Sequence, residues 1–305
     1  MPIQIDKDKP KMTGSVQTML TWTRVALSED EIPSEYLPYF NKLTFDCEVF
    51  PYTLIAPPMK NRWYKPVERL ITCIGDQLFV LEKQNKKISQ QSMHLNPGID
   101  LELGNSLLFS WITLRDLSTG ARTRKIILTF NAATARHYEP LLRKIRPSIK
   151  ADSTDQAQNP TSLQKALVSA DFKFNHFAQE SILPGEMVRD SLWQPAFKTP
   201  SFTLLGKNLF HIKTLAHMTI LTQSELILLW DDERGLENRG VRYGGIRRFI
   251  PIKHIKHVSV NNPVNHASSL FLTLSDDSHV YRSFESNNQN ALLPFSQRVI
   301  SPVSA

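Results

Sequence analysis

The chain has 305 residues, of which 41% are hydrophobic and 21% charged, a composition typical of a globular protein of about two domains. Its formal net charge of +7 favours anionic partners such as phosphate, nucleic acid or a membrane surface. Cys47 and Cys73 are the only cysteines, which excludes a disulfide framework and a cysteine-rich zinc site. The N-terminus is charged where a signal peptide needs an apolar core, and no apolar run approaches the ~18 residues of a membrane span. We therefore expect a cytoplasmic protein without a transmembrane segment, and peripheral membrane contact is left open.

Residues 1–44 form an N-terminal extension. The stretch "SEDEIPSEYLPYFNKL" predicts a short helix or helical turns, interrupted by Pro33 and Pro38, because proline removes a backbone donor. Residues 1–15 are expected to be frayed.

Residues 45–147 have the pattern of a β-rich domain closed by a helix. "QLFVLE" is a short apolar run bounded by turn signals, and "IDLEL" (Ile99–Leu103) alternates with period two, which predicts one wet and one dry face. "KIILTF" follows as a last strand. A helix with Asn131 as its N-cap should come next and should kink or begin close to Pro140. Its apolar stripe comprises Ala135, Tyr138, Leu142 and Ile145.

Residues 148–171 are a polar linker, in which "SLQKALVSA" predicts a short helix. The last segment, 172–305, then repeats the order of 45–147, from "ELILLW" and "HVSV" to "HVYRSF" and a helix striped by Leu292, Phe295 and Val299. The matched pairs include Leu54/Leu192, Leu78/Leu226, Thr113/Thr273, Asp116/Asp276, Phe130/Phe284 and Pro140/Pro294. An internal duplication explains this order; the alternative is two unrelated β-rich domains.

Two units of this kind resemble pleckstrin-homology-like (PH-like) domains, most closely those of the bacterial PH and GRAM type. The second unit carries the resemblance in the hairpin "TILTQSELILLWDD" (Thr219–Asp232), a variable loop, and the strand "FIPIKHIKHVSV" (Phe249–Val260). The first unit is more divergent, with "ISQQSM" in place of "IPIKHI". The resemblance implies a mainly β (α+β) chain of two tandem, partly open barrels, each capped by a C-terminal helix. It also implies lipid or protein binding without catalysis.

The stretch "NRGVRYGGIRRF" is the candidate binding site. It holds Arg239, Arg242, Arg247 and Arg248 together with three glycines and no acid. Glycines let a backbone wrap an anion, and arginine forks bind phosphate at two points. Lys253 and Lys256 in "IPIKHIKHV" would extend this basic patch. The alternative is a solvated loop whose arginines pair with nearby acids or with another surface of the chain.

Other chemistry finds little support in the sequence. It contains no nucleophile-elbow, zinc-protease, phosphate-loop or dinucleotide motif, so no enzyme and no cofactor is predicted. His254 and His257 lie three apart, on opposite faces of a strand, which argues against a metal site. The basic clusters at Lys83–Lys87 and Arg122–Lys125 are interpreted as solvated hairpin tips.

The sequence thus predicts a non-catalytic binding or scaffolding protein. Its basic loop would contact an anionic lipid headgroup or an acidic protein surface. Nucleic acid is the alternative partner, although no recognised nucleic-acid motif is present. The oligomeric state is left open.

Overall fold

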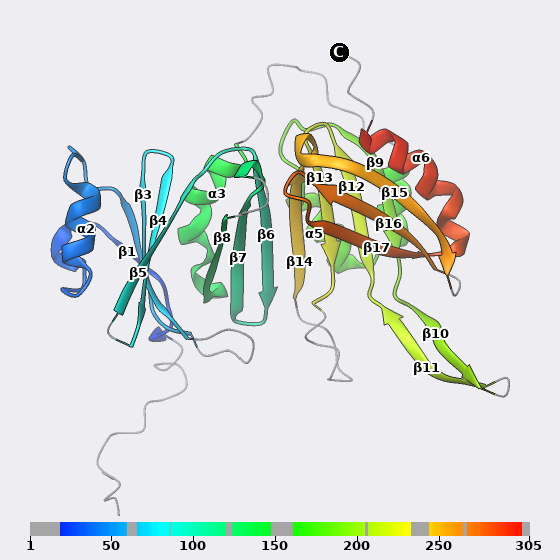
Figure 1. The fold of residues 1–305 in the computed structure, drawn as a ribbon, viewed down its shortest axis with the longest axis horizontal. Coiled ribbons are helices and arrows are strands. Elements are labelled where there is room, and N and C mark those ends of the chain that lie inside the picture. The colour runs from blue at the N-terminus through cyan, green and yellow to red at the C-terminus, as the bar shows by residue number, and fades with distance from the viewer. Residues whose placement is uncertain are drawn as a thin grey trace, which may run out of the picture. The chain divides into compact units, whose positions relative to one another are not determined.

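The computed structural model describes residues 19–59, 66–85, 87–119, 124–147, 161–204, 207–232, 244–264 and 267–300. The chain is mainly β with antiparallel strands, and it divides into two compact units (Figure 1). The first unit comprises Met1–Ser92 with Thr129–Tyr138, and the second comprises Met93–Leu128 with Glu139–Ala305. Residues 1–15, predicted to be frayed, lie outside the described part of the chain.

A five-stranded sheet of order β1-β2-β3-β4-β5 forms the first unit. Its strands are β1 (Arg24–Ala26), β2 (Tyr52–Ala56), β3 (Glu68–Ile74), β4 (Gln77–Gln84) and β5 (Lys87–His94). The predicted N-terminal helical segment is present as the 3-10 turn η1 (Glu29–Glu31) and helix α2 (Leu37–Thr44). Tyr36 and Phe40 bury their rings against Leu70 and Leu81 of the sheet. The N-terminal extension is therefore part of the core, and it adds strand β1 that the sequence did not predict.

Three further strands complete the first half of the sequence. They are β6 (Ile99–Ser106), β7 (Phe109–Asp116) and β8 (Arg124–Asn131), with the 3-10 turn η2 (Leu117–Thr119) after β7. The predicted closing helix consists of a 3-10 segment, η3 (Ala132–Tyr138), and an α-helix, α3 (Glu139–Ile145). The carboxamide oxygen of Asn131 accepts a hydrogen bond from the Ala133 N–H, as expected of a cap. Helix α3 begins beside Pro140, where the missing N–H costs nothing.

The second half begins with two helices, α4 (Thr161–Ser169) and α5 (Phe172–Ser181). Helix α4 lies in the predicted linker, at the place where "SLQKALVSA" predicted a helix. The strands of the second half are β9 (Val188–Gln194), β10 (Phe197–Leu204), β11 (Lys207–Thr214), β12 (His217–Thr222), β13 (Glu225–Trp230), β14 (Gly245–Pro251), β15 (Ile255–Val264), β16 (Ala267–Leu274) and β17 (His279–Glu285). The 3-10 turns η5 (Ile252–His254) and η6 (Ser286–Asn288) and helix α6 (Gln289–Ile300) complete it.

The element order repeats, as the aligned sequence pairs predicted. Strands β2 to β8 and helix α3 are followed, in the same order, by β9, β12 to β17 and helix α6, with the β10–β11 hairpin inserted after β9. The matched residues Asp116 and Asp276 each accept hydrogen bonds from the backbone N–H and hydroxyl of the serine two positions later, Ser118 and Ser278. The same aspartate–serine hydrogen bonds at matched positions support a duplication over two unrelated domains.

The sheets join the two repeats in a way that the sequence did not predict. Strands β6 to β8 of the first repeat belong to a seven-stranded sheet of order β8-β7-β6-β14-β13-β12-β9. Strands β15-β16-β17 form a separate sheet, and β10-β11 form a two-stranded one. None of these described sheets closes on itself as a barrel. The compact units consequently differ from the predicted ranges 45–147 and 172–305, because β6 pairs with β14.

The core of the second unit lies between the sheet containing β12 to β14 and the sheet β15-β16-β17. Leucines from both sheets pack there with the predicted stripe of α6, Leu292, Phe295 and Val299, all fully buried. Pro294 lies inside α6, so this helix continues through its proline whereas α3 begins at its own. Figure 1 shows α6 beside the three-stranded sheet, and the β10–β11 hairpin extending beyond the sheet from which it arises.

Candidate functional site

Arg247, near the end of the predicted basic loop, is tied to helix α5. Its Nη1 donates to Glu180 Oε2 at 2.8 Å, and its guanidinium carbon lies 5.5 Å from the centre of the Phe177 ring. Burial lowers the pKa of Arg247, and Glu180 offsets part of that effect. Arg247 and Arg248 are consecutive in β14 and therefore lie on opposite faces of the sheet. They do not form one basic surface.

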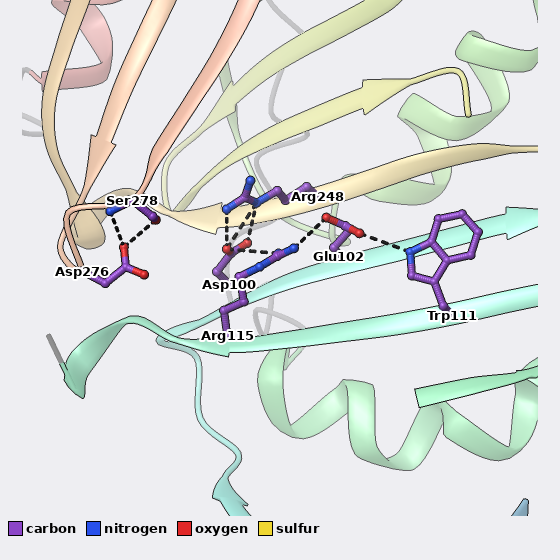
Figure 2. Close-up of polar contacts among 7 residues, drawn as sticks. All are labelled: Asp100, Glu102, Trp111, Arg115, Arg248, Asp276 and Ser278. Atoms are coloured by element: carbon purple, nitrogen blue, oxygen red, sulfur yellow. Dashed lines mark hydrogen bonds and ion pairs between the residues drawn. The ribbon is translucent and has the colours of Figure 1, made fainter. Parts of the chain in front are cut away.

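Arg248 forms a two-point ion pair with Asp100 of β6 (Figure 2). Arg248 Nε lies 2.9 Å from Oδ1 of Asp100, and Nη2 lies 2.6 Å from Oδ2. The Asp100 side chain is 0% exposed, and paired N–H···O contacts of this kind are the strongest between arginine and carboxylate. Burial alone would lower the pKa of Arg248, but the Asp100 carboxylate outweighs it and raises the pKa. Arg248 is therefore engaged inside the protein.

Three more side chains complete this group, which we call the Asp100 cluster: Asp100, Glu102, Trp111, Arg115 and Arg248. Arg115 of β7 donates from Nη1 to Asp100 Oδ2 at 3.4 Å and from Nη2 to Glu102 Oε2 at 3.0 Å. Trp111 Nε1 donates to Glu102 Oε1 at 3.2 Å. Burial opposes ionisation of Glu102, yet Arg115 and the tryptophan N–H outweigh burial and lower its pKa. The positive charges of the two arginines thus equal the negative charges of the two carboxylates in this cluster.

The Asp100 cluster lies at the junction of the two repeats. Strand β14 runs antiparallel to β6, with Arg248 opposite Glu102 and Phe249 opposite Leu101. The period-two pattern of "IDLEL" predicts a wet face for its acids, whereas in the structure Asp100 is fully buried and Glu102 is partly buried, and both pair with arginines. Of the two consecutive arginines in β14, only Arg248 pairs with an acid of β6, whereas Arg247 pairs with Glu180 of α5. No local pattern indicated that these segments meet.

Glycines 244 and 245 have structural roles at this junction. Gly244 has φ +104°, and a Cβ there would lie 2.1 Å from the carbonyl oxygen of Asn105. The N–H of Gly245 donates to Oδ1 of Asn105 at 3.0 Å, and a Cβ on Gly245 would lie 2.4 Å from the Phe177 ring. Only glycine allows such close approach. The predicted role of these two glycines in wrapping an anion is therefore not needed to explain them.

Lys173 of α5 holds both ends of the segment that carries the remaining loop arginines. Its Nζ forms an ion pair with Asp231, after β13, and donates to the carbonyl oxygen of Gly244 at 3.3 Å. Arg239 and Arg242 lie in the segment between these ends, outside the described residues. The structure thus describes where the basic loop begins and ends.

Lys253 and Lys256 follow the other end of β14. That strand runs from Gly245 to Pro251, a length of roughly 20 Å, so neither lysine extends the patch at Gly244. Lys256 pairs with Asp277 at 2.6 Å, and Lys253 is exposed. The six predicted anion-binding residues are therefore not gathered into one surface where the structure describes them.

A second buried ion pair lies elsewhere in the second unit. Arg146 Nη2 donates to Glu225 Oε2 at 2.8 Å and to the carbonyl oxygen of Ser181 at 2.7 Å. Its guanidinium stacks 3.7 Å above the Phe249 ring. Burial raises the pKa of Glu225 in spite of Arg146. This pair fixes the end of α3 against the sheet, and nothing about it indicates a reaction.

The predicted strand Phe249–Val260 is not continuous, because the 3-10 turn η5 divides it into β14 and β15, and the register of β15 shifts between Ile255 and His257. His254 Nδ1 lies 3.0 Å from the hydroxyl of Ser275. Across the part of the chain that the structure describes, no three His, Cys, Asp or Glu side chains come together as metal ligands. Among the same residues no helix is both long and apolar enough to cross a bilayer.

Comparison with known proteins does not assign the chain to a family. No protein-family model matches the chain, and no curated protein matches it.

Proposed function

We propose that this chain is a non-catalytic binding or scaffolding protein whose basic loop contacts an anionic partner, either a lipid headgroup or an acidic protein surface. The loop cations that we assign to this contact are Arg239 and Arg242. Arg247 and Arg248 are left out because Glu180 and Asp100 already neutralise them. The contact would take place in the cytoplasm, at a membrane periphery where the partner is a lipid.

The observation that carries the proposal is the anchoring of the loop at both ends by Lys173. Anchored ends reduce the conformational entropy that a loop of residues 233–243 loses when it binds. The acids Glu233 and Glu237 come first in this segment, and the stretch from Asn238 to Tyr243 contains two arginines and no acid. The repeated order of seven strands and a helix is compatible with the resemblance to PH-like domains, which supports a binding role.

Co-sedimentation with vesicles tests the lipid form of the proposal. We expect the chain to bind vesicles that contain phosphatidylserine, to bind neutral vesicles poorly, and to dissociate as salt rises. Each arginine near an anionic surface contributes about 1 kcal/mol. The double variant Arg239→Gln/Arg242→Gln should therefore bind roughly 30-fold more weakly.

The matched control removes the same charge elsewhere. Arg124 and Arg143 are both exposed, so Arg124→Gln/Arg143→Gln changes the net charge equally without touching the loop. If both double variants lose binding equally, the contact is non-specific and the assignment to the loop is wrong. If neither variant binds less than the parent chain, the loop does not contact lipid at all.

Nucleic acid is the alternative partner, supported by the same net charge of +7. A nucleic-acid contact would show a logarithmic decrease of affinity with salt whose slope counts the neutralised phosphates. Titration of fluorescent single- and double-stranded DNA and RNA at several salt concentrations measures that slope. Absence of binding at low salt removes this alternative and leaves the lipid and protein forms.

A further inference from the structure

The junction between the repeats joins two different strand edges. One edge belongs to β14, which follows β9, β12 and β13 in the second repeat. The other belongs to β6, which precedes β7 and β8 in the first repeat. Five consecutive residues of each strand pair, Gly245–Phe249 with Leu101–Asn105. A contact between two unlike edges is heterologous. Each repeat has one edge of each kind, so in the described part of the chain pairing β6 with β14 leaves the second edge of each kind unpaired.

The unused counterpart of β14 is β5 of the first repeat. Among the described residues, β5 is the outermost strand of its sheet. Ser89, Gln90 and Gln91 at its centre are exposed. The stretch Ile88–Met93 contains no charged residue, proline or glycine. Natural edge strands often carry charged residues or proline, which prevent pairing with another chain, and the centre of β5 contains neither.

The unused counterpart of β6 is β15 of the second repeat. It is an outer strand of the three-stranded sheet. Its register with β16 shifts after Ile255 and again after Asn261, and the stretch His257–Asn261 between the shifts is regular. That stretch has five residues, as many as β6 contributes to the internal junction. Its central residues, "VSV", are uncharged.

We infer that the chain associates head to tail with further copies of itself, β15 of one copy adding to the β5 edge of the next. The partner is a second copy because the chain already contains this contact once, between β6 and β14, and the two edges are its remaining halves. In this contact, antiparallel pairing gives hydrogen-bond partners to backbone N–H and C=O groups on the outer side of β5 and of β15. Because the contact is heterologous, it propagates into an open series or a ring. This inference does not depend on the arginine loop.

The experiment uses complementary blocked variants of the full chain. Successive residues of a strand direct their N–H groups to opposite edges, so either Gln90→Pro or Gln91→Pro removes an outward donor of β5 and leaves the sheet intact. Circular dichroism and thermal melting identify which of the two folds like the parent chain. Ser259→Pro and Val260→Pro serve in the same way for β15. Mass is measured by light scattering and sedimentation equilibrium, with reductant present because Cys47 is partly exposed.

A five-residue contact is small, so the association is weak and requires protein on the order of 100 µM. The parent chain should show a mass that rises steadily with concentration. Each blocked variant alone should remain monomeric, and an equimolar mixture of the two should form dimers and nothing larger. A parent chain that stays monomeric overturns the inference. A mixture that stays monomeric overturns it as well, and so does a blocked variant that dimerises by itself.

Discussion

Removal of the Asp100 charge is the most direct test of how the junction between the repeats is held. Asp100→Asn keeps the size of the side chain, so it creates no cavity, but it removes the carboxylate charge that pairs directly with Arg248. The Asp100 side chain is fully buried, and the Arg248 side chain is 13% exposed. Removing one partner from a buried pair typically costs about 3–5 kcal/mol. Because the amide oxygen can still accept one hydrogen bond, we expect a loss near the lower end, about 3 kcal/mol.

Replacing both partners should cost much less than removing one. In Asp100→Leu/Arg248→Met neither buried charge remains, and apolar side chains of similar volume take their place, which is often close to neutral. Arg115 keeps Glu102 as its partner at 3.0 Å. We therefore expect the double variant to lie within about 1.5 kcal/mol of the parent chain, which gives a clear coupling between the two positions.

Urea unfolding measures these differences, and hydrogen exchange of the β6 and β14 amides reports on the junction itself. The control is Glu139→Gln, which removes an exposed pair with Arg143 and should change the free energy of unfolding by less than about 0.5 kcal/mol. If Asp100→Asn costs no more than this control, the buried pair does not hold the junction. If exchange of the β6 and β14 amides is unchanged, the loss of stability has another origin.

Two further predictions concern acid stability and backbone strain. Burial lowers the pKa of His217 to about 4 from an unfolded value of 6.5, so the unfolded chain binds the proton first. The free energy of unfolding should then fall by roughly 3 kcal/mol as pH decreases from 6.5 to 4. His217→Leu should remove that component from the pH profile measured by urea unfolding, and an unchanged profile would show that His217 ionises freely. Gly244→Ala should cost about 3 kcal/mol because its Cβ would meet the Asn105 backbone, whereas Gly75→Ala, at φ +54° in open space, should cost about 1 kcal/mol; equal thermal unfolding of the two variants would contradict this.

The strands and helices of this chain were largely predictable because their signals are local. "QLFVLE", "ELILLW" and "KIILTF" carry their own periodicity and turn residues, and each is a strand. The stripe at Leu292, Phe295 and Val299 reports a helix in the same way. The repeat could also be predicted, because matched residues such as Asp116 and Asp276 keep their order along the chain, and both accept a hydrogen bond from the N–H of the serine two positions later.

The pairing of β6 with β14 could not be predicted by these means. The paired residues Leu101 and Phe249 are 148 positions apart, and alternation in one strand says nothing about which strand lies beside it. Strand β1 was missed for a related reason, since its three residues, Arg24–Ala26, are too short to show any period. The resemblance to two separate units further favoured two separate sheets.

The pairing of Arg247 and Arg248 within the chain follows from the same distinction between local and distant signals. Closeness in sequence groups Arg247 and Arg248 with Arg239 and Arg242, but neighbouring side chains of a strand point to opposite faces. Once β14 includes both residues, each must be neutralised by whatever lies on its own face, Glu180 on one and Asp100 on the other. Where a run of basic residues continues into a strand, the residues on each face of the strand should therefore be considered separately before a ligand is assigned to them. Within the run Arg239–Arg248, that division leaves Arg239 and Arg242 as the residues proposed to contact an external anion.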